Sequence, residues 1–394
     1  IDIHDIGSLT LQDVQAQVDS VYITSKNDLY VNYVYDPSYI ELTSNNGAII
    51  DGNGNSLNIE TNPGGQLILS AANGIGSGNA LETEVSYLEA YNSDSGNIEI
   101  DNTGDLTITS SGVVNDGGDI NITTSSSLYV EAEISVVDYG EINLTANGAD
   151  GDIVIRDTIF SEDGDINLTA GRDILTDGAW GDGITAVQSY GEGDINLNAV
   201  RDIILGSEPS IYGNDYGYGD IYSDDGDINL TAGRDITVDY YTYVGADGVG
   251  NISFAAGNDI NLITRVVGEK SWIYTDSGDI DLTAGNDILI DTLSEGVTSD
   301  TGNITFYAGN DINVGYVETD GNVVMTADSN ITISSGTVIS NGGSVDLTAN
   351  SGSIYAIGPG PHIKALLTSY LTAPYGVVGT ISGYPSAGYG PINV

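Results

Sequence analysis

Six aspartates recur at one position of a repeated motif and are candidate metal ligands. They are Asp173, Asp202, Asp235, Asp259, Asp287 and Asp311, and each follows an arginine or an asparagine. Asparagine precedes Asp259, Asp287 and Asp311, so these three form an acidic, oxygen-rich column if successive copies of the motif stack. Such a column suits a hard cation, and Ca²⁺ is the one candidate cofactor. The alternative is that each aspartate accepts backbone N–H bonds from its own turn.

Arginines stand beside the other aspartates of this column. Arg172, Arg201 and Arg234 each precede the aspartate of their copy. Stacked carboxylates ~4.8 Å apart repel one another by about 0.9 kcal/mol in water. We expect the arginines to offset this repulsion. The glycine-rich nonapeptide of calcium-binding solenoids is absent, so the Ca²⁺ prediction depends on the aspartate column alone.

Asn-X-Ser/Thr triplets are candidate sites for N-linked sugars. They begin at Asn121, Asn143, Asn167, Asn229, Asn251, Asn303 and Asn330. We expect all but the last to hold outward positions on the first strand of the motif. The alternative is that the asparagines and threonines form ladders on that outer face. Sugars ~4.8 Å apart would crowd one another, so we do not expect every triplet to be occupied.

Tyrosine supplies most of the aromatic residues, with 25 copies against two tryptophans and three phenylalanines. The tyrosines cluster in variable segments, such as IYGNDYGYGDIY from Ile211 and DYYTYV from Asp239. Exposed tyrosines combine a large apolar face with a polar tip, which suits sugar stacking or a protein interface. The alternative is that they stack on one another between neighbouring coils.

The motif that positions all these residues is a short strand followed by a corner. Its string GDINLTAGRDI occurs at Gly164–Ile174 and again at Gly226–Ile236, and variants begin at Gly193, Gly250, Gly278 and Gly302. Apolar and polar residues alternate in the first half, which is typical of a strand with one buried face. The spacing between copies varies, as expected when a fixed corner is joined by variable outward loops. The sequence therefore predicts an all-β, single-stranded parallel β-helix, a β-solenoid of roughly fifteen coils.

The regularity of the repeat divides the chain into three expected segments. Residues 1–95 hold irregular coils and a cap, residues 96–357 hold the regular repeats, and residues 358–394 form an apolar Gly/Pro/Tyr-rich tail. The tail has almost no charge, so we expect it to cap its own chain or to add a strand to a neighbouring subunit. The expected assembly residues are His362, Ile363, Leu366, Leu367, Tyr370, Leu371, Tyr375, Val377, Val378 and Ile381.

Composition argues against several classes of function. With 57 acidic and 8 basic side chains the formal charge is −49, which disfavours nucleic acid and anionic membranes as partners. There is no cysteine, His4 and His362 are the only histidines, and no apolar run is long enough to span a membrane. Polysaccharide lyases need basic residues to neutralise acidic substrates. An enzyme is therefore not expected, and a polysaccharide-active β-helix enzyme is the least favoured alternative.

The strings GDINLTAGRDI, GDIDLTAGNDI and GNITFYAGNDI resemble the haemagglutinin-type repeats of filamentous-haemagglutinin-like exported adhesins. The resemblance covers roughly Gly96–Ala349, although the Asn-Pro-Asn-Gly secretion signature of that family is absent. It implies a right-handed parallel β-helix and an extracellular, cell-surface protein. We expect a filament subunit whose main partner is itself, joined end to end through the tail. The alternative is the stalk of an adhesin that binds glycans or other cell-surface proteins.

Overall fold

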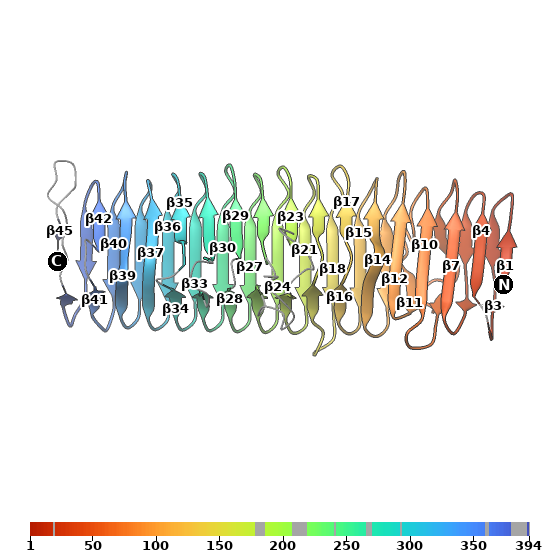
Figure 1. The fold of residues 1–394 in the computed structure, drawn as a ribbon, viewed down its shortest axis with the longest axis horizontal. Coiled ribbons are helices and arrows are strands. Elements are labelled where there is room, and N and C mark those ends of the chain that lie inside the picture. Colours follow the sequence, from red (N-terminus) through yellow and green to blue (C-terminus); the bar gives the residue numbers. More distant parts are fainter. Residues whose placement is uncertain are drawn as a thin grey trace. The chain divides into compact units, whose positions relative to one another are not determined.

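The chain folds as an all-β parallel β-solenoid of about 14 turns without a helix, which confirms the predicted fold class (Figure 1). The structure is a computed structural model. It describes residues 1–18, 20–177, 186–206, 219–239, 242–264, 270–291, 294–358, 362–379 and 392–393. Among these residues there is no helix that could cross a membrane. Two compact units divide the chain, namely residues 1–175 with 186–196, and residues 176–185 with 197–394.

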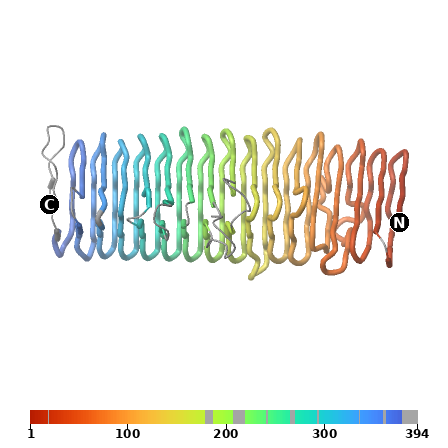
Figure 2. Tube along the Cα trace, viewed as in Figure 1, coloured from red at the N-terminus to blue at the C-terminus, as the bar shows by residue number. Residues whose placement is uncertain are grey.

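In the first unit each regular coil contributes one strand to sheet 1 and one or two strands to sheet 2, and neighbouring coils lie side by side (Figure 2). Sheet 1 here contains β3 (Val14–Gln15), β6 (Val34–Tyr35), β9 (Ile59–Glu60), β11 (Leu81–Glu84), β13 (Ile98–Asn102), β15 (Ile120–Thr124), β18 (Ile142–Ala146) and β21 (Ile166–Ala170). Sheet 2 contains β1 (Asp2–His4), β4 (Val21–Ser25), β7 (Tyr39–Ser44), β10 (Gln66–Ala71), β12 (Tyr87–Asn92), β14 (Leu106–Asn115), β16 (Leu128–Val130), β17 (Ile134–Val136), β19 (Ile153–Ile155), β20 (Ile159–Ser161) and β23 (Val187–Ser189). A third, small sheet joins β2 (Leu9–Leu11), β5 (Leu29–Val31) and β8 (Ile49–Asp51). The N-terminal coils therefore use the same parallel pairing as the regular ones.

The second unit repeats this plan. Sheet 1 continues with β27 (Ile228–Ala232), β30 (Ile252–Ala256), β33 (Ile280–Ala284), β36 (Ile304–Ala308), β38 (Val323–Ala327), β40 (Val345–Ala349), β43 (Ser369–Thr372) and β45 (Ile392–Asn393). Sheet 2 holds β25 (Ile203–Leu205), β26 (Ile221–Ser223), β28 (Ile236–Val238), β29 (Tyr243–Ala246), β31 (Ile260–Leu262), β32 (Trp272–Thr275), β34 (Ile288–Ile290), β35 (Gly296–Ser299), β37 (Ile312–Thr319), β39 (Ile331–Ser340), β41 (Ile354–Ile357), β42 (Ile363–Ala365) and β44 (Val377–Gly379). β22 (Ile174–Thr176) and β24 (Ile195–Ala199) have residues in both units.

The core of the second unit consists of apolar columns that run from coil to coil. One column contains Leu230, Phe254, Leu282 and Phe306, and each of these residues pairs in register with the next. None of these side chains is more than 1% exposed. Their neighbours along each strand point outward, because successive residues of a strand face opposite sides. The alternation in the sequence therefore fixes which side chains are removed from water.

Glycines at the corners allow the coils to stack closely. A Cβ atom added to Gly278 would lie 1.9 Å from the carbonyl oxygen of Gly250 one coil earlier, and one added to Gly302 would lie 1.8 Å from that of Gly278. A second column follows the strand, where a Cβ on Gly285 would lie 2.1 Å from the oxygen of Gly257. A side chain at these positions would meet the backbone of the preceding coil, which explains why glycine recurs there, although the copy that begins at Gly193 has Val200 at the second position.

The described part of the expected tail forms a further coil of its own chain. Ile363 pairs with Val338, Leu371 with Leu347, and Val377 with Ile354, all in parallel register. The repeat therefore extends beyond residue 357, where the sequence analysis ended it, because the tail keeps the apolar alternation despite its lack of charge.

Individual tail residues differ in their environment. His362, Ile363 and Leu371 are buried, and both ring nitrogens of His362 lie within 3.1 Å of the carbonyl oxygens of Gly336 and Gly358. The side chains of Leu366, Leu367, Tyr370 and Tyr375 are exposed. Val377 is half-buried, the strand β44 includes Val378, and Ile381 lies outside the described residues. The buried side chains of His362, Ile363 and Leu371 serve the chain's own core, and the assembly role of the other predicted residues stays a prediction.

Candidate functional sites

The aspartate column is a hydrogen-bonded ladder between coils. Asp259 Oδ1 accepts hydrogen bonds from the side-chain nitrogen of Asn286 at 2.8 Å and from the backbone nitrogen of Asp287 at 3.0 Å. Asp287 Oδ1 receives the same pair of bonds from Asn310 at 2.8 Å and Asp311 at 2.9 Å. Each aspartate thus caps the corner of the following coil. The alternative in the sequence analysis was that each aspartate accepts backbone N–H bonds from its own turn. The aspartates do accept backbone N–H bonds, but from the following coil.

Arginine takes the place of asparagine in the earlier rungs. Arg234 Nε donates to Asp202 Oδ1 at 2.7 Å, and Arg172 Nε donates to Asp152 Oδ1 at 2.6 Å. The main partner of each of these two arginines is therefore the carboxylate one rung earlier. Asp152 was missed in the sequence analysis, although it precedes Ile153 just as Asp173 precedes Ile174. Searching for this Asp-Ile pair, without the preceding arginine or asparagine, would have found it.

The ladder gives the oxygens of the proposed calcium ligands another partner. Asp311 Oδ1 also accepts two bonds, from the backbone nitrogen of Asn330 at 2.8 Å and from its side chain at 3.0 Å. In the part of the chain that the structure describes, no three His, Cys, Asp or Glu side chains gather closely enough to hold a metal ion. Ca²⁺ binding by Asp259, Asp287 and Asp311 stays a prediction from sequence, and the hydrogen bonds alone account for the column.

Replacing Asp287 with alanine should lower the free energy of unfolding by about 1–3 kcal/mol, because the donors of Asn310 and Asp311 lose their acceptor. Asp287→Asn is the matched variant, since an amide oxygen can still accept both bonds. Chemical denaturation in the presence of a chelator should therefore show a much smaller loss for Asp287→Asn.

The same pair of variants separates the ladder from a calcium site. If Ca²⁺ binds the column, it should stabilise the unaltered protein, and this gain should vanish in Asp287→Asn. Equal losses for the two variants in chelator would contradict the ladder as the role of Asp287.

The asparagine triplets fall into two structural groups. Asn121, Asn143 and Asn167 face outward on β15, β18 and β21, where Asn143 donates to Asn121 at 2.9 Å and Asn167 to Asn143 at 2.9 Å. Asn229 has the equivalent position on β27. This outward placement agrees with the expectation, and so does the ladder that was its alternative.

The remaining triplets begin at corners and correct the expected placement. Asn251 and Asn303 directly precede β30 and β36, and their side-chain nitrogens donate to Asp227 at 3.0 Å and Asp279 at 3.1 Å. They were expected on the strand because the triplet alone does not reveal whether it starts before or after the first apolar residue. Asn330, also at a corner, belongs to the aspartate ladder. Glycosylation at any triplet stays a prediction, and at Asn143, Asn167, Asn251, Asn303 and Asn330 it would act on a nitrogen that already donates to the preceding coil.

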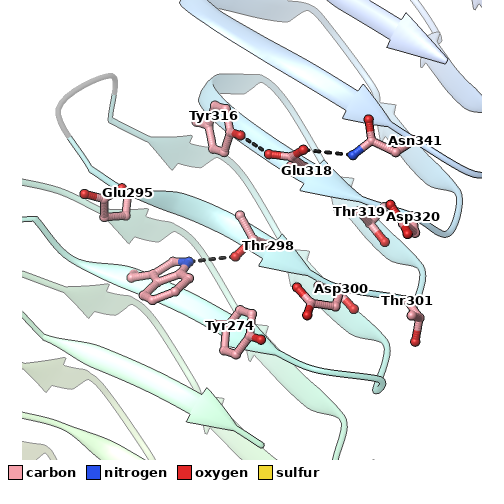
Figure 3. Close-up of a pocket in the computed structure, with 12 residues that line it drawn as sticks. Tyr274, Glu295, Thr298, Asp300, Thr301, Tyr316, Glu318, Thr319, Asp320 and Asn341 are labelled. Carbon is pink, nitrogen blue, oxygen red and sulfur yellow. Dashed lines mark hydrogen bonds between the residues drawn. The ribbon is translucent and has the colours of Figure 1, made fainter.

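The structure has a groove on the outer face of sheet 2 that the sequence did not predict. It has a volume of about 610 Å³ and crosses the strands β32, β35 and β37 in the second unit (Figure 3). Trp272 and Tyr274 line it, with ring centroids 4.8 Å apart, and the indole nitrogen donates to Thr298 Oγ1 at 2.7 Å. Tyr243, one coil earlier, lies 5.6 Å from the Trp272 ring. Of the expected tyrosine clusters, this one is partly described, whereas residues 211–218 lie outside the described part.

Acidic and amide side chains form the opposite part of the groove. Glu318 accepts hydrogen bonds from the hydroxyl of Tyr316 and, at 2.8 Å, from the side-chain nitrogen of Asn341. Burial and the hydrogen bond to Glu318 raise the pKa of Tyr316 above its usual value, so the phenol stays neutral. Glu295 forms an ion pair with Lys270 at 2.7 Å. The signal in the sequence was weak because these residues come from coils that are separated by variable loops.

Comparisons with known proteins do not assign the chain to a family. No protein-family model, curated protein or solved structure matches it. The fold implied by the resemblance to adhesin repeats is thus established by the structure alone, as a parallel β-solenoid.

Proposed function

We propose that this protein is an extracellular structural protein, a subunit that joins copies of itself end to end into a cell-surface filament. The contact would be made by residues 362–379, here called the last coil, whose strand β43 also pairs with β45. The observation that carries the proposal is a set of four exposed apolar side chains on that coil, in a chain whose net charge is −49. Resemblance of the repeats to those of exported adhesins supports the cell-surface location, and family membership is part of the proposal.

The apolar surface of the last coil is defined by four side chains. Leu366, Leu367, Tyr370 and Tyr375 are 42%, 58%, 51% and 77% exposed. Large exposed apolar side chains on one weakly charged coil are candidates for an interaction site. Among the described strands, β42 and β44 each pair with a strand on one side only, whereas β43 also pairs with β45, so the proposed place for a strand from another chain is the edge of β42 and β44.

Charge favours contacts at the ends of the coil stack over contacts along its sides. At −49 per chain, two copies that approach side by side repel one another. A contact restricted to the weakly charged last coil keeps most of these charges more than a Debye length of ~10 Å apart. End-to-end association therefore carries less electrostatic cost than lateral aggregation.

The double variant Leu367→Glu, Tyr375→Glu should stay folded and lose self-association. Both side chains are exposed, so the substitutions leave the core intact, while the new charges oppose burial at a contact. Light scattering after gel filtration and negative-stain microscopy would measure assembly, and circular dichroism would check the fold. Deleting the whole tail is a poorer test, because it also removes the buried Ile363 and Leu371.

Tyr139→Glu is the matched control. Tyr139 is 80% exposed and belongs to the first unit, more than 200 residues before the last coil in the sequence. Its substitution should leave assembly unchanged. Filaments from the double variant would contradict the proposed contact. If the unaltered protein is folded and monomeric, the filament proposal is contradicted. The alternative, the stalk of an adhesin, is then favoured, and the aromatic groove on sheet 2 is the observation that supports it.

A further inference from the structure

We propose that the groove lined by Trp272, Tyr274, Tyr316 and Glu318 binds an uncharged oligosaccharide segment. This inference does not depend on self-association, because the groove lies on the side of the coils and uses none of the assembly residues. Its volume of about 610 Å³ lies within the range of ~300–1,000 Å³ typical of small-ligand sites.

The aromatic wall of the groove is held rigidly. The Trp272 indole is fixed by its hydrogen bond to Thr298 and by ring contacts with Tyr243 on the preceding coil and Tyr274 two residues along β32. Fixed aromatic rings bind with little loss of side-chain freedom, and their apolar faces match the C–H faces of a sugar ring.

A glycine keeps the space beside the indole open. Gly296 is the register partner of Trp272 on the next coil, so no side chain stands there. Its φ of +98° favours glycine, and a Cβ would lie 2.3 Å from the carbonyl oxygen of Tyr316. Both the backbone conformation and the contact therefore exclude a larger residue at this point of the groove wall.

The polar wall has the groups that recognise hydroxyls. Asp300 and Asp320 offer carboxylate acceptors, Thr301 offers a donor and acceptor, and Asn341 has an amide. Figure 3 shows Asp300, Thr301 and Asp320 together at one end of the groove, with Tyr316 and Glu318 along its side. Aromatic faces beside acceptors and donors suit a ligand with many hydroxyls.

The charges of the groove select among polymers of this kind. The lining carboxylates are Glu295, Asp300, Glu318 and Asp320, and they would repel sulfated or carboxylated glycans. Glu295 is already paired with Lys270, and Glu318 accepts from two neutral donors. Two of the four carboxylates are therefore engaged by the protein itself, and Asp300 and Asp320 are the acceptors offered to sugar hydroxyls.

Titration with neutral hexasaccharides tests the proposal. Maltohexaose, cellohexaose, mannohexaose and chitohexaose serve as probes, with a heparin hexasaccharide and hexalysine as the charged alternatives. The chain has two tryptophans, so in the Trp180→Phe variant all tryptophan fluorescence comes from Trp272. At least one neutral sugar should change this fluorescence in a saturable way, and heparin should not.

Variants then locate the site by calorimetry. Trp272→Ala should weaken sugar binding at least about tenfold, since a tryptophan that a ligand covers commonly contributes much of the binding free energy. Glu318→Gln keeps the shape of the groove and should weaken binding less, and Tyr139→Ala, far along the chain, should have no effect. If Trp272→Ala fails to fold, Tyr274→Ala removes the second ring of the aromatic wall and provides the second test. Binding of hexalysine or heparin without sugar binding, binding unaffected by these groove variants, or no binding of any probe would overturn the proposal.

Discussion

Leu230→Asp should unfold the coils around β27, with a loss of about 3–5 kcal/mol in the free energy of unfolding. The Leu230 side chain is fully buried and pairs in register with Phe254 on the next coil. An aspartate there places a charge among aliphatic and aromatic side chains, where no donor is available to it. Thermal melting followed by circular dichroism, and hydrogen exchange of β27 and β30, would measure the effect.

Thr231→Asp is the matched control for this substitution. Thr231 is the next residue of the same strand, but its side chain is exposed, because alternate residues face opposite sides of the sheet. It should change stability by no more than about 0.5 kcal/mol. Equal melting temperatures for Leu230→Asp and the unaltered protein would mean that the inward and outward faces of β27 have been assigned wrongly.

Gly278→Ala should destabilise the second unit by about 3 kcal/mol although it adds a single methyl group. The new Cβ would lie 1.9 Å from the carbonyl oxygen and 2.5 Å from the carbonyl carbon of Gly250. Backbone atoms cannot rotate away as a side chain can, so the two coils would have to separate locally. That separation would weaken the strand pairing of β30 with β33.

Ser277→Ala tests whether the corner is sensitive to any change. Ser277 precedes Gly278 and its side chain is exposed, so alanine should be tolerated there. Urea denaturation of both variants would give the comparison. If the Gly278→Ala and Ser277→Ala proteins are equally stable, the corner has room for a methyl group and the close contact between Gly278 and Gly250 is wrong.

The sequence by itself determined the architecture. Alternating apolar residues in strings such as GDINLTAGRDI specify which side chains face inward, because a strand has a period of two residues. The invariant corner and the variable spacing specify stacked coils joined by loops. The recurrence of Asp259, Asp287 and Asp311 at the same corner also identified a real column, since equivalent positions of stacked coils lie above one another.

Only the tertiary structure decided which atoms meet between coils. The carboxylate of Asp287 could cap its own turn or the next coil, and the bonds that it accepts from Asn310 and Asp311 show that it caps the next coil, whereas Ca²⁺ binding stays a prediction. The tail likewise could leave the chain, but Ile363 and Leu371 complete apolar columns of its own core. The aromatic groove unites Trp272 and Glu318, which are distant in sequence. Local periodicity fixes the direction of each side chain, whereas loop lengths and strand register fix its neighbours, and these depend on the packing of the whole stack.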